Sequence, residues 1–360
     1  MAQIDAFFKL MNEQGASDLH MIAGQQPMLR IRGDMERVKY KVFTSDELKA
    51  MLYEIVTEDK IKVFEETGDV DFGYEIPGLA RYRGNLFMQK YGIGGVFREI
   101  PSNILTVQQL GLPKVLINLA QLPKGMVLVT GPTGSGKSTT LAAIVDEVNR
   151  TRKHHILTIE DPIEFVHHSQ SCIVNHREIG AHTRSFAAAL RGALREDPDV
   201  IMVGEMRDLE TIALAMEAAM TGHLLFGTLH TLNASKTVDR IIEIFPASQQ
   251  AQVRSTLADA LKAVVSQTLF KRIDVKGRCA ALEILLCTPA VRNLIREGKT
   301  YQLTSAMQTG KKYGMQTMDD AIMDLLDKRW ISAEAAYTQG VEKEKFVKFL
   351  KKPPSDFSDF

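Results

Sequence analysis

Gly131-Pro-Thr-Gly-Ser-Gly-Lys-Ser138 is the stretch of sequence that decides the fold. It carries the full G-x-x-x-x-G-K-S pattern between an apolar run, Met126–Thr130, and an expected helix from Ser138 to Val148. Glycines let the backbone turn its N–H groups inward around phosphate oxygens, at the positive end of the following helix. A chance glycine-rich turn would lack this context, so the pattern predicts a phosphate-binding loop.

The loop also predicts which groups contact the ligand. Lys137 is expected to contact the β- and γ-phosphates, and Ser138 is expected to ligate Mg²⁺, so the expected cofactors are ATP and Mg²⁺. The other positions expected to contact nucleotide are Gly131, Pro132, Thr133, Gly134, Ser135, Gly136, Thr139, Glu160 and Asp161.

Three further short runs, residues 155–159, 200–203 and 224–229, are almost wholly apolar and alternate with expected helices. Strands that are buried on both faces are typical of a parallel sheet covered by helices on each side. The sequence therefore predicts an α/β domain with a mainly parallel sheet, with the phosphate loop at its carboxyl edge.

Acidic residues follow two of these runs. Glu160, Asp161 and Glu164 come after the first, and Glu205 comes after the second, with Gly204 where a Walker B motif commonly has aspartate. Phosphoryl transfer needs one carboxylate near the metal and another that orients or deprotonates water. We favour Glu205 as the catalytic group and Glu164 as the Mg²⁺ ligand, directly or through water. The two roles could be exchanged, and either cluster could be a solvated loop.

Histidine and arginine side chains complete the candidate site. His230 follows the run 224–229 and is a candidate γ-phosphate sensor. Arg81, Arg83 and Arg98 could neutralise charge on the transferred phosphoryl group across a subunit contact, because arginine commonly supplies this function in trans. The alternative is that they are surface arginines on strands.

The chain of 360 residues, 45% of them hydrophobic, is too long for one ordinary domain. Residues 1–100 mix an amphipathic helix with alternating segments and predict a small α+β domain, followed by a proline-broken linker over 101–113. Residues 114–360 form the second domain, which is expected to be mostly helical from about 250. The helices expected there are 251–270, 288–298 and 316–327, and a frayed tail is expected from Pro353.

Bulk composition narrows the class of protein. Lysine plus arginine equals aspartate plus glutamate at 44 each, and no basic stripe with interleaved aromatics is present, which argues against a nucleic-acid partner. Three scattered cysteines argue against a disulfide framework and fit a reducing cytoplasm. No apolar run reaches the ~18 residues that span a bilayer, so no direct membrane insertion is expected.

Four segments together resemble the Walker A, Asp box, Walker B and His box of the secretion ATPase superfamily, in that order. They are residues 131–138, 158–164, 203–208 and 221–231, and the glycine in the Walker B segment is that superfamily's own form. Residues 16–20, 305–308 and 314–319 resemble its PilT-type branch, the type IV pilus retraction ATPases. So does a C-terminal signature, residues Ala290, Val291, Arg292, Asn293, Leu294, Ile295, Arg296 and Glu297.

This resemblance implies a PAS-like N-terminal domain, a RecA-like P-loop ATPase domain with a helical C-terminal region, and a homo-hexameric ring. It also implies ATP hydrolysis that drives pilin disassembly and twitching motility, at a pilus platform protein of the inner membrane. The motor would then be cytoplasmic, held peripherally at that membrane by the pilus machine, and residues 290–297 would couple hydrolysis to the pilus.

Alternative readings remain. The chain could be the accessory retraction ATPase, a paralogue that shares the nucleotide motifs and is itself a possible partner of the principal motor. A nucleotide-binding scaffold without useful turnover, or a nucleic-acid translocase, would use the same loop. Residues 290–297 could also be only an amphipathic helix that packs on the core.

Overall fold

The computed structural model describes residues 2–31, 33–100 and 103–351. The chain divides into two compact units, one running up to Asn103 and including Pro162–Val166, the other comprising Ile104–Asp161 and the chain from His167 onward. Residues 101 and 102 of the predicted linker lie outside the described residues, as does the predicted tail from Pro353.

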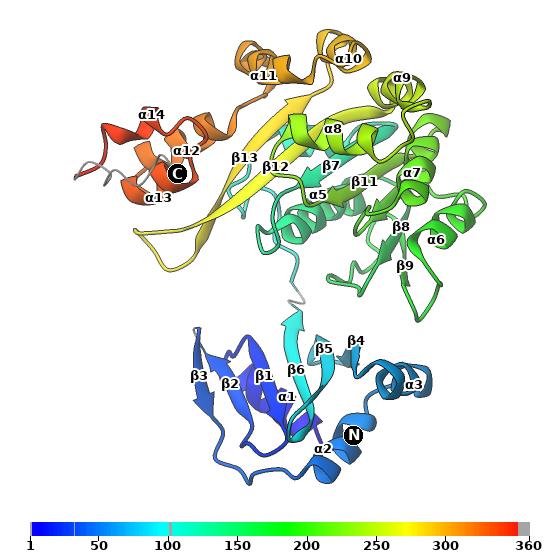
Figure 1. The fold of residues 1–360 in the computed structure, drawn as a ribbon, viewed down its shortest axis with the longest axis vertical. Coiled ribbons are helices and arrows are strands. Elements are labelled where there is room, and N and C mark those ends of the chain that lie inside the picture. Colours follow the sequence, from blue (N-terminus) through cyan, green and yellow to red (C-terminus); the bar gives the residue numbers. More distant parts are fainter. Residues whose placement is uncertain (1, 32, 101–102, 352–360) are drawn as a thin grey trace. The chain divides into compact units, whose positions relative to one another are not determined.

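The described residues of the first unit form a six-stranded antiparallel sheet in the order β3-β2-β1-β6-β5-β4, with helices packed on it (Figure 1). Its elements are α1 (Asp5–Glu13), β1 (Asp18–Ile22), β2 (Met28–Ile31), β3 (Asp34–Arg37), α2 (Ser45–Tyr53), α3 (Glu58–Thr67), β4 (Asp69–Ile76), β5 (Ala80–Gln89) and β6 (Gly92–Ile100).

An aromatic cluster fills the core of this unit. Phe8 of α1 stacks on Tyr82 of β5 with 4.1 Å between ring centroids, and it meets Phe97 of β6 edge to face. Side chains of β5 alternate between the core and the surface, so Arg81 and Arg83 point away from this cluster. The α+β character expected of the N-terminal part is confirmed.

The described residues of the second unit form a seven-stranded sheet in the order β13-β12-β7-β11-β10-β8-β9. All neighbouring strands are parallel except the β12–β13 pair. The strands are β7 (Gly125–Thr130), β8 (His155–Glu160), β9 (Ile173–Glu178), β10 (Val200–Val203), β11 (Leu224–Leu229), β12 (Leu261–Lys271) and β13 (Arg278–Leu286). The expected α/β class and mainly parallel sheet are confirmed.

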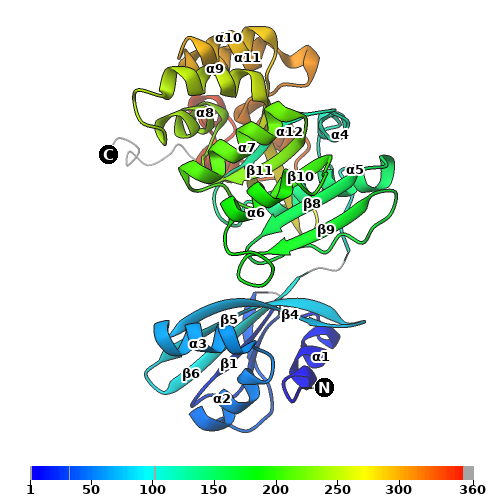
Figure 2. The ribbon, with the colours of Figure 1, turned by 90° about the vertical axis from the view of Figure 1, so that its right-hand side faces the viewer.

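Helices cover both faces of this sheet (Figures 1 and 2). Met126 and Leu128 of β7 point into one apolar core, and Val127 and Val129 point into another. The helices are α4 (Val115–Ala120), α5 (Lys137–Thr151), α6 (Phe186–Ala193), α7 (Leu209–Thr221), α8 (Ala234–Glu243), α9 (Gln250–Ala260), α10 (Pro289–Arg296), α11 (Leu303–Thr309), α12 (Met318–Asp327), α13 (Ala333–Gln339) and α14 (Glu344–Val347), with short 3₁₀ turns η1 (Thr300–Gln302) and η2 (Lys311–Tyr313). Nowhere in the described ranges is a helix both long and apolar enough to cross a bilayer.

The prediction of one helix over 251–270 is wrong. Helix α9 ends at Ala260, and the chain continues directly as strand β12, paired with β7 on one side and with β13 on the other. An apolar run that is buried on both faces has no helical or strand period to distinguish it, and no glycine or proline marks the change at residue 260. Strand β13 was also not predicted, although Gly277 directly precedes it.

Burial in this sheet gives a stability prediction. Phe226 of β11 is fully buried between β7 and β10, so replacing it with alanine leaves a cavity. We expect Phe226→Ala to lower the free energy of unfolding of the second unit by about 3–5 kcal/mol. Urea unfolding followed by fluorescence of Trp330, the chain's single tryptophan, measures this.

Ile173→Ala, at a side chain 64% exposed on edge strand β9, is the control. It should change the free energy of unfolding by no more than about 0.5 kcal/mol. An equally small loss for Phe226→Ala would contradict the described packing.

Candidate active site

The parallel register brings the predicted site segments to one edge of the sheet. Thr130 of β7 is paired with Leu229 of β11, so Gly131 and His230 each follow directly beyond a matched pair. Val203 of β10 is paired with Gly227, which places Glu205 beside the same edge. With strands ~4.8 Å apart and β11 between them, β10 lies about 10 Å from β7.

The phosphate loop has the backbone that its glycines require. Gly131, Gly134 and Gly136 have φ angles of +141°, +78° and +85°, a region that side-chain-bearing residues rarely adopt. A Cβ on Gly131 would also clash with the Gln267 carbonyl oxygen, and one on Gly136 would lie 2.8 Å from the Gln267 side-chain nitrogen. These glycines therefore leave a cradle that only a bare backbone can line.

Two polar groups in this loop fit a phosphate ligand. Lys137 Nζ donates to the carbonyl oxygens of Gly131, at 2.9 Å, and Pro132, at 3.1 Å, so its ammonium lies folded over the loop. The Ser135 hydroxyl is buried without a hydrogen-bond partner among the described residues. A buried hydroxyl without a partner is costly, and a phosphate oxygen would satisfy it.

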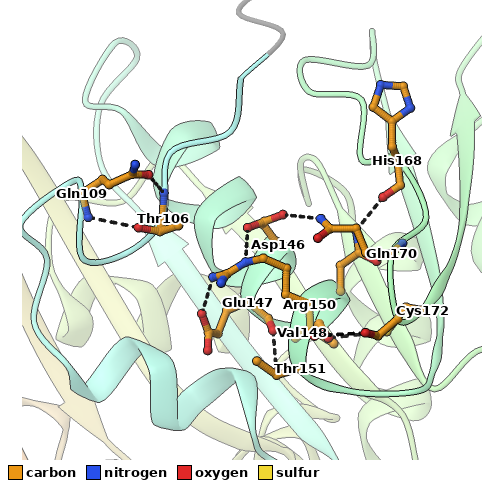
Figure 3. A network of polar contacts seen from close by, with 12 residues as sticks. Thr106, Gln109, Asp146, Glu147, Val148, Arg150, Thr151, His168, Gln170 and Cys172 are labelled. Carbon is orange, nitrogen blue, oxygen red and sulfur yellow. Dashed lines mark hydrogen bonds and ion pairs between the residues drawn. The ribbon is translucent and has the colours of Figure 1, made fainter.

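The opposite end of helix α5 is held by a polar network (Figure 3). Arg150 pairs with Asp146 at 2.7 Å and with Glu147 at 2.6 Å, and Gln170 Nε2 donates to the other oxygen of Asp146 at 3.1 Å. Asn149 donates to the carbonyl of His168 at 2.8 Å. The two arginine pairs lie within α5, whereas the contacts of Asn149 and Gln170 tie this end of the helix to residues 168–170.

Gly204 shows why the position before Glu205 carries no side chain. Its N–H donates to the Ile159 carbonyl at 2.8 Å, and an added Cβ would lie 3.3 Å from that oxygen and 3.4 Å from Glu160 Cα. Its carbonyl accepts a hydrogen bond from the Thr228 hydroxyl of β11. The glycine thus lets β10 join tightly to both neighbouring strands where Glu205 emerges.

Glu205 contacts two of its neighbours directly. His230 Nε2 lies 2.7 Å from Glu205 Oε1, and the Arg207 guanidinium pairs with the same oxygen. Burial acts to raise the pKa of Glu205, but Arg207 and His230 outweigh it and hold the pKa below its ordinary value. Glu205 is therefore ionised at neutral pH and able to accept a hydrogen bond from water.

A cavity of about 430 Å³ opens beside this carboxylate. Its lining mixes the three interacting side chains with apolar residues and one further arginine, and comprises Glu205, Met206, Arg207, Ile212, Leu229, His230, Thr231 and Arg240. The Arg207 side chain is 76% exposed and that of Glu205 is 20% exposed. Most of the Glu205 side chain is therefore covered, but part of it is accessible to solvent. Sequence reasoning did not identify Arg207 or Arg240.

The other acidic candidates are placed differently. Glu160, the last residue of β8, is buried with His176 Nδ1 3.8 Å from its carboxylate, whereas Asp161 is exposed. Glu164 lies in the segment Pro162–Val166, which groups with the first unit. There it lies 3.8 Å from Arg83. The structure thus brings Glu205 into contact with His230.

The three candidate arginines share one outward face of the first sheet. Arg83 of β5 is paired directly with Arg98 of β6, and Arg81 lies two residues before Arg83. Like charges opposite one another are unfavourable unless acids compensate them. Asp18 binds Arg98 at 2.7 Å, and Glu75 lies 3.4 Å from Arg81. Asp71 lies 3.9 Å from Arg83, so acids balance all three arginines, while the Arg83 and Arg98 side chains are 43% and 71% exposed.

Residues 290–297 divide into two faces. Val291 and Ile295 are fully buried in the core, which supports the packing interpretation for that side of α10. Ala290, Asn293, Arg296 and Glu297 are exposed. Asn293 donates to Glu297 at 2.7 Å, and Arg296 pairs with Asp259 of α9. The exposed face is thus a fixed polar surface, while Arg292 and Leu294 are half-buried.

Comparisons with known proteins identify the family of this chain. A family model described as type II/IV secretion system protein matches residues 96–329. The type IV pilus retraction ATPase PilT of Pseudomonas aeruginosa is 54% identical over 93% of this chain and 97% of that protein. The type IV pilus ATPase PilU of the same organism is 40% identical over 93% of this chain and 87% of its own length.

A crystal structure of the pilus retraction motor PilT with bound ADP is also similar. It superposes with a TM-score of 0.88 at 43% identity, covering 96% of this chain and 98% of that one. The fold is therefore shared along almost the whole length. The chain belongs to the type II/IV secretion system protein family and, within it, to the type IV pilus retraction ATPases.

Proposed function

We propose that this chain hydrolyses ATP as the ring motor that powers type IV pilus retraction, the disassembly of pilin subunits that underlies twitching motility. The observation that carries the proposal is the contact of Glu205 with His230 at the same sheet edge as the Gly131–Ser138 loop. Identity of 54% to a retraction ATPase supports the coupled activity.

The residues of this edge suggest how hydrolysis proceeds. Backbone N–H groups of the loop and Lys137 hold the β- and γ-phosphates, and the ionised Glu205 accepts a hydrogen bond from the attacking water. We assign to His230, which contacts Glu205, the role of sensing a bound γ-phosphate. The water oxygen bonds to the γ-phosphorus, the bond to the bridging oxygen breaks, and ADP and phosphate leave.

Mg²⁺ fits this donor set. In the described ranges no group of three or more His, Cys, Asp or Glu could hold a metal. Mg²⁺ in such enzymes is bound by one or two protein oxygens together with substrate phosphates, and Ser138 at the start of α5 can supply one. When bound, the ion neutralises charge that develops on the phosphates. Glu164 and Glu160 are the further candidates for a contact through water.

Assembly into a homo-hexamer would give the three candidate arginines a role in catalysis. The side chains of Arg83 and Arg98 are 43% and 71% exposed and that of Arg81 only 17%, and an arginine supplied by a neighbouring subunit stabilises the transferred phosphoryl group. In this proposal the catalytic site is complete only in the ring. The predicted domains, 1–100 and 114–360, joined by the linker 101–113, would then move with each round of hydrolysis.

Coupling to the pilus would use the exposed face of α10. We assign to it the contact with the platform protein, which would hold the cytoplasmic ring peripherally at the inner membrane. The accessory retraction ATPase is a further possible partner. Since identity to PilT exceeds identity to PilU, 54% against 40%, the principal motor is the favoured assignment over the accessory paralogue.

Two other functions are less well supported. A nucleotide-binding scaffold would have no need for the Glu205–His230 contact, and a nucleic-acid translocase would need a basic channel that the balanced charge of the chain does not favour. Binding of DNA that falls steeply with salt would revive the translocase.

Hydrolysis by the purified protein tests the assignment of Glu205. Glu205→Gln keeps the size of the side chain but removes the carboxylate that orients water, so we expect kcat to fall roughly a hundredfold or more. Affinity for ADP should stay within about threefold, because the phosphate loop is unchanged. Phosphate release and equilibrium binding of labelled ADP measure the two quantities.

Glu210→Gln, an exposed carboxylate near the start of α7, is the matched control and should keep the wild-type kcat. Lys137→Ala should lose both hydrolysis and binding. Wild-type turnover by Glu205→Gln would show that another group activates water, with Glu164 the next candidate.

Deletion of the gene tests the cellular function. Cells without the motor should keep long, immobile pili and lose twitching, because assembly would continue without retraction. Electron microscopy of the cells and twitching assays measure this outcome. Absence of pili would indicate an assembly ATPase instead.

Complementation of the deletion strain then separates coupling from hydrolysis. The double variant Asn293→Ala, Glu297→Ala changes only exposed side chains of α10, so the purified protein should hydrolyse ATP as the wild type does while cells fail to retract pili. Full retraction by this variant would contradict the assignment of the exposed face to the platform.

A further inference from the structure

Strand β12 runs beyond the end of β7 and passes beneath the phosphate loop. Ser266 is paired with Thr130, the last residue of β7, so the chain from Gln267 to Lys271 continues past the strand's end. Gln267 and Leu269 lie two residues apart and share a face. They approach Gly136, whose added Cβ would lie 2.8 Å from the Gln267 side chain and 3.2 Å from Leu269.

The side chain of Gln267 binds the loop on both sides of Lys137. Its Nε2 donates to the Ser135 carbonyl at 2.7 Å, and its Oε1 accepts from the Thr140 hydroxyl at 2.7 Å. A carbonyl can only accept, so the Ser135 contact fixes which end of the amide is nitrogen. At 2% exposure, Gln267 makes both contacts away from water.

The two hydrogen bonds of Gln267 do more than satisfy a buried polar side chain. The neighbouring polar residue, Ser266, satisfies its buried hydroxyl with Thr130, the last residue of β7, at 2.8 Å. Gln267 instead ties Ser135, two residues before Lys137, to Thr140, three residues after it. The amide therefore sets the separation of the two segments that place the lysine and the loop N–H groups.

We propose that Gln267 is a positioning residue that holds the phosphate loop in its nucleotide-binding conformation from an adjacent strand. This rests on the proposed function, since ATP is the ligand whose phosphates the loop receives. Hydrogen bonds of this kind act on bound substrate and transition state alike, so their loss raises KM and leaves kcat nearly unchanged.

Steady-state hydrolysis of ATP by full-length Gln267→Leu tests the proposal, together with its affinity for ADP. The leucine removes both hydrogen bonds at similar volume, and we expect KM and the dissociation constant for ADP each to rise roughly tenfold with kcat within about threefold. Gln267→Glu keeps the acceptor for Thr140 but loses the donor to Ser135, and it should raise both constants at least as much.

Ser266→Ala is the matched control, because it removes a buried hydrogen bond from the same strand to Thr130 of β7. It should lower the melting temperature comparably but leave KM and ADP affinity at wild-type values. The proposal is overturned if the Gln267 variants behave as Ser266→Ala does, with lower stability and unchanged KM. Absence of turnover in the wild type would instead count against the proposed function, and ADP affinity would still test Gln267.

Discussion

The parallel register of β7, β11, β10 and β8 is the constraint on which the site depends. Each strand ends at the same edge, so residues that lie 25 to 99 positions apart in the chain emerge side by side: Gly131, His230, Glu205 and Glu160. A one-residue slip in any pair would turn the wrong side chain toward the loop. Burial of both faces makes such a slip costly, because the apolar residues of these strands pack into one of two cores.

Strand β12 places a second constraint on the phosphate loop. The loop is bounded by strand β12, which excludes side chains at Gly131 and Gly136, while the Gln267 amide ties together the segments on either side of Lys137. The same strand continues into the core that receives helices α12 to α14, where Phe270 packs with residues of those helices. The nucleotide loop and the C-terminal helices thus share one rigid element.

Much of the sheet edge that carries the candidate site could be predicted from the sequence, because the patterns that specify it are local. The G-x-x-x-x-G-K-S pattern and the apolar runs each specify a strand, a turn or a helix end within a few residues. Strand β12 could not be predicted so easily, since its run is apolar on both faces and follows α9 without a break. The signal that sequence reasoning missed is Ser266-Gln267, a polar pair inside an apolar run, which is typical of buried side chains with specific partners.

The sequence did not distinguish the roles of Glu164 and Glu205 in catalysis, because both residues follow apolar runs. The contact with His230 depends on the register of β10 and β11, a non-local property. The grouping of Pro162–Val166 with the first unit likewise depends on tertiary packing. The direct pairing of Arg83 with Arg98 across β5 and β6 also follows only from the register.

The central claim is that one sheet edge holds the phosphates and aligns the water. A crystal structure of the assembled protein with Mg²⁺, ADP and a γ-phosphate mimic tests it most directly. We predict the mimic within hydrogen-bond distance of Lys137 and the loop N–H groups, with a water between it and the Glu205 carboxylate. A mimic bound in the loop with Glu205 turned away, and another carboxylate holding that water, would contradict the account.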